Sequence, residues 1–456
     1  MSLSTIPFLF GALPIFLVIY YLVRPPYRMY VLLIFSAWFY YVNEPARIWV
    51  AGILLICNYL VALGISRGRQ KGKVRCSGCL LTVGVLGDVL LLLFFKFRLG
   101  GQGLLTGQSF FTFTLISYLA DVYLGKCRAE KNAVRFADYV LMFPKVIMGP
   151  IARYEDVAEG FGHRICLGDI GMGARRFMTG FCKKTILADN LALLVNEVNA
   201  DMADASVAAL WIGAAAYSLQ LFFDFSGYSD MAIGLAQMLG FHLKENFKYP
   251  YCCKSVTDFW RRWHISLSEW FRDYVYIPLG GSRRSVCRNI LNLLAVWILT
   301  GIWHGTGLAF VAWGLVYFFM LVLERYVIKP QRLGKPLAAV WRVVTLLVVN
   351  FNWVLFSHSS LRAGLRYCAR MVGVYGFTGW ANVTDIRILR EYGVYLLLGI
   401  VFSMPAAEAV RGKLEKTLPG QRVLKIVVPV AYLAVFLWGL SFVLLGFHNP
   451  FMYQQF

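Results

Sequence analysis

Two histidines occupy positions where an acid–base group could meet a ligand. His264 follows Trp263 in a serine-containing segment, and His304 follows Trp303 at the end of an apolar run with several glycines. Glycines have no side chain, so they would leave room for a ligand beside His304. Imidazole has an ordinary pKa of ~6.5, which suits a general base near neutral pH. The two histidines therefore indicate a function in proton transfer. The alternative is a structural role for each of them.

One reaction that needs such groups is acyl transfer from a thioester to a hydroxyl. A base removes the hydroxyl proton as the oxygen attacks, and N–H or O–H donors stabilise the oxyanion. The sequence contains no G-x-S-x-G, Walker A or H-E-x-x-H motif. Cys76 and Cys79 form a single C-x-x-C pair with no second pair at zinc spacing. The sequence therefore predicts no metal site.

Further polar residues collect in the middle of the chain, at about 215–310. Asp224 and Tyr228 interrupt one apolar run. Ionisable groups at membrane depth are costly, and they commonly line a cavity or pair with one another. We expect Asp224, Tyr228 and Trp303 to border a substrate cavity. The alternative for Asp224 is a helix kink at which its carboxylate caps a neighbouring helix.

The segment 257–276 mixes aromatic, basic and hydroxyl residues. Its pattern predicts two short helices with a break near His264 and with Thr257 as the N-cap of the first. Ser266 and Glu269 have the spacing of a capping box. Tryptophans recur at helical spacing and give an apolar face. The alternative to a cavity wall is an amphipathic helix at the lipid headgroups.

The elements that must position these residues are membrane helices. Of the 456 residues, 59% are hydrophobic and 15% are charged, and the mean hydropathy is +0.61. Long apolar runs lie at 6–23, 48–65, 80–95, 208–223, 289–303, 308–323, 337–356, 392–403 and 423–447. Together with shorter runs they predict an all-α, polytopic membrane protein of roughly ten to thirteen membrane elements. We expect a single domain over residues 1–456.

The charge distribution also fits a membrane protein. The formal net charge is +21, and the basic residues stand in short loops, where the positive-inside rule and anionic lipids account for them. This distribution predicts no nucleic-acid partner. The first apolar run has no charged residue before it and no clear cleavage site, so we expect a retained helix. Arg24 and Arg28 after this run predict that the N-terminus is outside.

At these residues the sequence resembles the membrane-bound O-acyltransferase superfamily, and within it the bacterial alginate O-acetyltransferase subgroup. The matching segments are 109–123, 143–153, 224–234, 245–247, 249–251, 258–281, 301–305 and 449–456. The longest and most specific motifs are R-R-W-H-I-S-L-S-x-W-F-R-D-Y and I-W-H-G. Segments 229–234 and 276–281 look more like this subgroup than like the related D-alanyl transferases of teichoic acid.

The resemblance implies a ring of helices around a funnel or tunnel through the membrane. It also implies that His304 is the catalytic residue and that His264 is its functional companion. The residues that would shape the cavity are Arg261, Trp263, Asp273 and Tyr276.

The implied activity is O-acyl transfer, with acetyl as the expected group. The donor would be acetyl-CoA, and no cofactor would be permanently bound. The expected partners are membrane lipid and a surface polysaccharide acceptor or an extracytoplasmic acetyltransferase, and the expected location is the bacterial cell membrane. The alternatives are D-alanyl transfer to teichoic acid and a non-enzymatic transporter of lipid or polymer.

Overall fold

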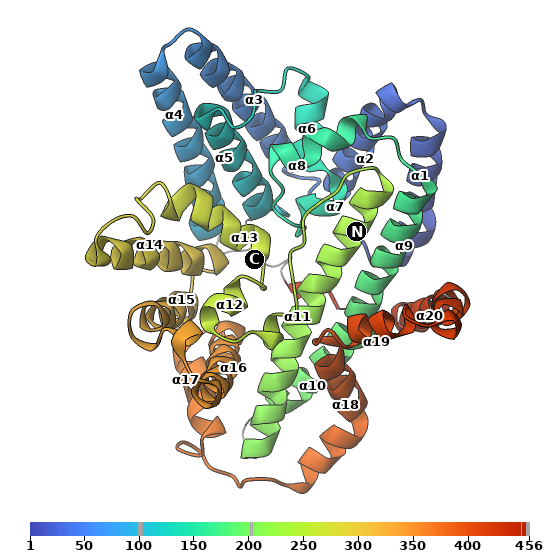
Figure 1. Cartoon of the computed structure of the whole chain (residues 1–456), viewed down its shortest axis with the longest axis vertical. Helices are drawn as coiled ribbons and strands as arrows, with labels where there is room; N and C mark the ends of the chain where they lie inside the picture. The colour runs from blue at the N-terminus through green and yellow to red at the C-terminus, as the bar shows by residue number, and fades with distance from the viewer. Residues whose placement is uncertain (99–103, 201, 203, 448, 453–456) are drawn as a thin grey trace. The chain divides into compact units, whose positions relative to one another are not determined.

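The structure, a computed structural model, describes residues 1–98, 104–200, 202, 204–447 and 449–452. Every regular element in these ranges is a helix, as the all-α prediction requires (Figure 1). The chain divides into two units. Unit 1 contains Met1–Gly180, Tyr228–Glu245 and Pro450–Phe456, and unit 2 contains Phe181–Gly227 and Asn246–Asn449. The single domain stays a prediction, and residues 453–456 of the C-terminal motif lie outside the described residues.

Seven helices of the described chain are long and apolar enough to cross a membrane. They are Ile48–Gln70 (α3), Val74–Phe97 (α4 and its extension), Val207–Met238 (α11), Val286–His304 (α14), Leu308–Arg332 (α15 and its extension), Lys335–Ser357 (α16) and Leu418–Leu444 (α20). Helices α18 (Val383–Phe402) and α19 (Ala406–Leu414), bent by 64°, would make an eighth if they form one span. These helices confirm a polytopic membrane protein.

The sequence predicts roughly ten to thirteen membrane elements, which is more than the seven spans, because shorter apolar runs are counted as well. The first apolar run, predicted at 6–23 as long enough to cross, forms a helix over Pro7–Leu22, which is shorter than the seven candidate spans. A helix needs about 20 residues to cross the hydrocarbon core. The shorter helices therefore do not meet the length criterion that the seven spans satisfy.

Unit 1 is built mainly from the N-terminal helices. Besides α3 and α4, these are α1 (Leu13–Leu22), α2 (Arg28–Asn43), α5 (Gln108–Leu124), α6 (Ala133–Leu141), α7 (Phe143–Val146), α8 (Tyr154–Ala158) and most of α9 (Leu167–Cys182). Helices α3, α4 and α5 lie side by side (Figure 1). A hydrogen bond of 2.8 Å from Asn58 to Asp88 joins α3 to α4. This bond satisfies buried polar groups that would otherwise be costly in a membrane.

Unit 2 contains the histidine motifs. Its helices are α10 (Asp189–Ala200), the first part of α11, α12 (Val256–Trp260), α13 (Ile265–Phe271), α14 to α16, α17 (Leu361–Met371) and α18 to α20. Helix α15 packs against both α14 and α16. The backbones of α14 and α15 approach closely, since a Cβ atom on Gly314 would lie 2.6 Å from the carbonyl oxygen of Trp297. This contact fixes the helix that ends at His304.

Helix α11 continues without a break from Val207 to Met238, through Asp224 and Tyr228. The local structure differs from the sequence prediction at the starts of two short helices. The N-cap of α12 is Ser255, whose side chain accepts a hydrogen bond from the backbone of Asp258, and not Thr257. Helix α13 begins after His264 with no side-chain cap, so the capping box expected there is also wrong.

Candidate functional site

His264 lies at the junction of two short helices. Helix α12 ends at Trp260, and α13 begins directly after His264, so the break predicted near this residue is confirmed. The backbone of His264 is left-handed, with φ 44° and ψ 55°, a conformation that few residues other than glycine adopt. The side chain is 1% exposed. The turn thus carries a buried imidazole.

Asn246 sets the tautomer of this imidazole. The Oδ1 atom of Asn246 lies 3.1 Å from Nδ1 of His264 and accepts hydrogen bonds from the hydroxyl and the backbone N–H of Ser266. A backbone N–H can only donate, so the Asn246 atom facing it must be the oxygen. Nδ1 of His264 must then carry the proton. In the neutral ring, Nε2 holds the lone pair that a base needs.

Aromatic rings surround His264. Its ring centroid lies 4.7 Å from that of Phe225, 6.4 Å from that of Phe247 and 6.3 Å from that of Trp303. His264 lies outside the seven candidate spans, and burial lowers the pKa of its imidazole to about 3. Burial in apolar surroundings disfavours the charged form. His264 is therefore neutral at pH 7.

His304 is the last residue of α14 and is 4% exposed. Its ring meets those of Trp313 and Phe356 edge to face, at centroid distances of 4.9 and 5.1 Å. The ring of Trp303 lies 4.5 Å from that of His304 and also packs against His264. The structure thus brings both predicted histidines to one tryptophan, within unit 2.

The glycines near His304 serve helix packing. A Cβ atom on Gly301 would lie 2.7 Å from the carbonyl oxygen of Phe310, and one on Gly305 would collide with the Phe310 ring. The expectation that these two glycines leave room for a ligand is therefore wrong, because Phe310 fills the space. Any substituted side chain at Gly301 would push α14 away from α15.

A cavity of about 240 Å³ lies beside α14. Its apolar wall consists of Trp260, Leu267, Phe271, Leu293, Val296 and Trp297, and its polar wall consists of Ser268, Arg272, Tyr276, Thr300 and Arg325. Thr300 precedes His304 by four residues on α14, so the two share one helix face. The cavity combines apolar surface with two guanidinium groups, a combination that suits an acyl chain attached to a phosphate-bearing carrier.

Hydrogen bonds hold Tyr276 at this cavity. Its hydroxyl accepts a hydrogen bond of 2.6 Å from the side-chain amide of Asn289 and one of 3.1 Å from Arg325. Trp263, in contrast, lies in the aromatic core, with its ring 4.8 Å from that of Trp353. Arg261 is exposed. These expected cavity residues therefore occupy three different environments.

The expected carboxylates take part in ion pairs. Asp273 accepts a hydrogen bond of 2.8 Å from its neighbour Arg272. Asp224 lies 2.8 Å from the Nζ atom of Lys184, which also contacts Asp189 at 2.7 Å, and all three side chains of this cluster are buried. Asp224 thus has an ion-pair partner that sequence reasoning missed. Buried charges are retained when they are paired and hydrogen-bonded.

Tyr228 belongs to unit 1, unlike the other expected site residues. It is fully buried, and its ring meets that of Phe451 edge to face at 5.2 Å. This contact joins α11 to the C-terminal segment. Tyr228 is therefore described with unit 1, and its place in a substrate cavity stays a prediction.

Glu324 anchors the start of α12. Its buried carboxylate accepts hydrogen bonds from the backbone N–H groups of Val256 and Thr257, from the Thr257 hydroxyl, and from the indole of Trp341. The first N–H groups of a helix have no partner within the helix, so this carboxylate satisfies them. Glu324 therefore fixes the short helix that leads to His264.

Glu324→Ala should destabilise the protein by about 3 kcal/mol or more, because each hydrogen bond to a charged group contributes about 1.5–3 kcal/mol. Glu324→Gln keeps an acceptor oxygen and should lose less. The measurement is the thermal unfolding midpoint of the purified protein in detergent. An unchanged midpoint in the alanine variant would contradict the anchoring role.

Sequence reasoning missed three residues that shape the site, namely Asn246, Glu324 and Trp313. Asn246 stands in the E-N-F segment of the resemblance, but no role was assigned to it. Glu324 is an acidic residue at the end of an apolar run, which is a signal that could have been used. Trp313 lies inside an apolar helix, and nothing in the sequence distinguishes it from packing residues.

Comparison with known proteins places the chain among acyltransferases. The model of the MBOAT, membrane-bound O-acyltransferase family matches residues 128–366. The chain is 38% identical over 428 residues to the probable alginate O-acetylase AlgI of Pseudomonas aeruginosa, covering 87% of this chain and 81% of the relative. It is 36% identical over 446 residues to the corresponding protein of Azotobacter vinelandii, covering 91% and 88%.

A teichoic acid D-alanyltransferase is a more distant relative. The protein of Bacillus subtilis is 28% identical over 276 residues, which cover 55% of this chain and 66% of the relative. The family match contains both histidine motifs and the cavity beside α14. This chain therefore belongs to the membrane-bound O-acyltransferase (MBOAT) family and is an O-acyltransferase.

Proposed function

We propose that this protein takes acetyl from acetyl-CoA and transfers it across the bacterial cell membrane for O-acetylation of a cell-surface or exported polysaccharide. The observation that carries the proposal is the pair of buried histidines that share Trp303, of which His304 ends the helix that lines a cavity with two arginines. The names of the alginate O-acetylase relatives support acetyl as the group and a polysaccharide as the acceptor.

His304 acts as the general base in this proposal. It removes the proton of the acceptor hydroxyl as that oxygen attacks the thioester carbonyl, and a tetrahedral oxyanion forms. The intermediate then collapses, the C–S bond breaks, and the proton passes to the departing thiol of CoA. His264, with its Nδ1 proton held by Asn246, stays neutral and presents Nε2 as a hydrogen-bond acceptor that orients the hydroxyl. In this proposal Tyr276 lines the cavity, and Asp273 holds Arg272, which also lines it.

The donor is held at the cavity beside α14. Arg272 and Arg325 offer guanidinium groups to the phosphates of CoA, and the apolar wall takes the carbon chain that leads to the thioester. Guanidinium groups match phosphate oxygens in geometry and charge. In this proposal the acyl end reaches the face of α14 that Thr300 and His304 share.

Trp313 donates a hydrogen bond to the oxyanion in this proposal. Its ring lies 4.9 Å from that of His304, and among the described residues its buried indole N–H has no acceptor. An unsatisfied buried donor is costly, and an oxyanion would satisfy it.

Trp313→Phe keeps most of the ring and removes only this N–H. We expect kcat to fall by about 10²-fold, the usual loss for one oxyanion donor, with little change in KM. The matched control is Trp353→Phe, which also removes a buried indole N–H but has no ring contact with His304 in the described structure. Equal losses in both variants would point to packing instead.

The assay that tests the proposed function is transfer of radiolabelled acetyl from acetyl-CoA by the purified protein in nanodiscs. Surface polymer extract is added as the acceptor. We expect label in the polymer and release of free CoA. If the wild type consumes no acetyl-CoA but uses D-alanyl carrier protein, the D-alanyl alternative is correct. If label stops on an extracytoplasmic partner protein, the transfer to polymer is a relay.

A further inference from the structure

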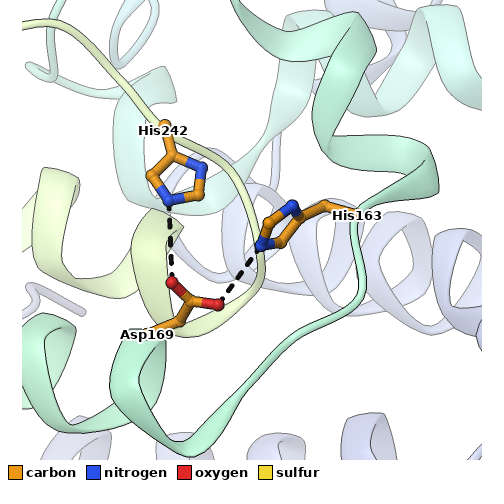
Figure 2. Close-up of side chains that lie close together, drawn as sticks. All are labelled: His163, Asp169 and His242. Atoms are coloured by element: carbon orange, nitrogen blue, oxygen red, sulfur yellow. Dashed lines mark hydrogen bonds and ion pairs between the residues drawn. The ribbon is translucent and has the colours of Figure 1, made fainter.

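A second group of histidines converges on a buried carboxylate in unit 1. Figure 2 shows the side chain of Asp169 facing the rings of His163 and His242. One carboxylate oxygen lies 3.2 Å from Nε2 of His163, and the other lies 3.7 Å from Nε2 of His242. The three potential ligand atoms all lie within 4.8 Å of one another. We propose that His163, Asp169 and His242 bind a Zn²⁺ ion.

The donor types and distances favour zinc. Zinc binds imidazole nitrogen and carboxylate oxygen at ~2.0–2.2 Å, so neighbouring ligands of a tetrahedral ion lie about 3.3–3.5 Å apart. Nε2 of His163 and Nε2 of His242 lie 3.2 and 3.7 Å from different oxygens of Asp169, and one ligand atom from each residue lies within 4.8 Å of the others. Mg²⁺ and Ca²⁺ prefer oxygen ligands, and a site with two imidazoles suits them poorly. Small movements of the two exposed histidines would complete the geometry.

Cys166 lies beside the same carboxylate and hydrogen-bonds to it. Its Sγ atom lies 3.2 Å from the Oδ2 atom of Asp169, and its backbone N–H donates to that oxygen at 3.1 Å. Two imidazoles and one carboxylate, with a water in the fourth position, are a reasonable ligand set for zinc.

Helix capping explains only part of this cluster. Asp169 is the third residue of α9, and a carboxylate there accepts the backbone N–H of the residue before the helix. That role needs neither histidine. His163 and His242 come from segments far apart in the chain, yet their rings meet edge to face with centroids 5.1 Å apart. Two exposed imidazoles at one buried carboxylate therefore indicate a ligand-binding group.

The ion would fasten two segments of unit 1 that already pack closely. A Cβ atom on Gly234 of α11 would lie 2.5 Å from the carbonyl oxygen of Gly173 of α9, so the two backbones touch. Arg176 of α9 pairs with Asp230 and with Glu245. The proposed ion joins the start of α9 to the segment after α11, at one end of this contact. Zinc therefore acts as a structural clip.

The test measures zinc in the whole protein, purified with an affinity tag that contains no histidine. The protein is loaded with Zn²⁺, passed through gel filtration and analysed by elemental mass spectrometry. We expect one zinc per chain in the wild type and in the control His358→Ala, which removes a histidine outside the cluster. His163→Ala and His242→Ala should each lose the ion. Gel-filtration profiles of the zinc-free forms check that the variants fold.

Two measurements on the wild type do not depend on any variant. Added Zn²⁺ should raise the unfolding midpoint, because a ligand that binds the folded state stabilises it. Co²⁺ in place of Zn²⁺ should give the visible absorption of a tetrahedral site. A wild type that retains no zinc, or a His163→Ala variant that retains it fully, would overturn the proposal.

Discussion

His304→Ala is expected to lower acetyl transfer by at least about 10²–10⁴-fold, the range that a positioned acid–base group contributes. The chain should still insert into the membrane, because His304 is not the C-cap residue of α14. Loss of its ring removes packing with the side chains of Trp303, Trp313 and Phe356. The measurement is the initial rate of CoA release in nanodiscs, together with membrane abundance. Loss of rate at wild-type abundance is the expected result.

The shape-retaining variant His304→Gln separates chemistry from packing. Glutamine fills much of the same space and forms hydrogen bonds, but it cannot act as a base near neutral pH. Its rate should therefore match that of the alanine variant, while its unfolding midpoint should lie closer to that of the wild type. A glutamine variant with normal transfer would remove His304 from the proposed chemistry.

The second large effect is expected for His264→Ala. The neutral imidazole presents Nε2 because Asn246 holds Nδ1, so removal of the ring takes away the acceptor that orients the hydroxyl. We expect kcat to fall by about 10²-fold or more. Asn246→Ala keeps the ring but frees its tautomer, so we expect a smaller loss. A larger loss in Asn246→Ala would show that Asn246 does more than orient His264.

The pH dependence of stability provides a second measurement for His264. Burial lowers its folded-state pKa to about 3, whereas an unfolded histidine has a pKa of ~6.5. The unfolded state therefore binds more protons between these values, and wild-type stability should fall as the pH drops below about 6.5. His264→Gln should lose this part of the acid sensitivity. An identical pH profile in the two proteins would contradict the burial of a neutral ring.

The sequence predicted the helical class and the break at His264 because both depend on local pattern. Apolar runs identify membrane helices, and the segment around His264 places serines and a histidine between two apolar helical turns. The exact caps were wrong. Ser255 and Thr257 are both good N-cap types. Glu324, which is distant in the sequence, binds the backbone N–H of Thr257, and Ser255 is the N-cap.

The rest of the site depends on long-range contacts. An isolated carboxylate is costly at membrane depth, so the sequence left open whether Asp224 lines a cavity or caps a neighbouring helix at a kink. In the structure Lys184 pairs with Asp224, and α11 remains continuous. Phe310 fills the space that the glycines of the I-W-H-G segment seemed to leave. Neither contact has a fixed sequence spacing. The residue types predicted where polar side chains occur in the chain. The contacts of these side chains depend on tertiary packing.

The buried ion pair between Lys184 and Asp224 also constrains how the chain is assembled during synthesis. Each charge at the bilayer centre costs about 2.5–3.5 kcal/mol when its helix enters lipid alone. The two residues are 40 positions apart, so Lys184 leaves the ribosome well before its partner. Lys184 lies outside the seven candidate spans, whereas Asp224 lies within α11. We expect the segment that carries Lys184 to stay hydrated until α11 has been made, because its charge gains Asp224 as a partner only when the helices pack.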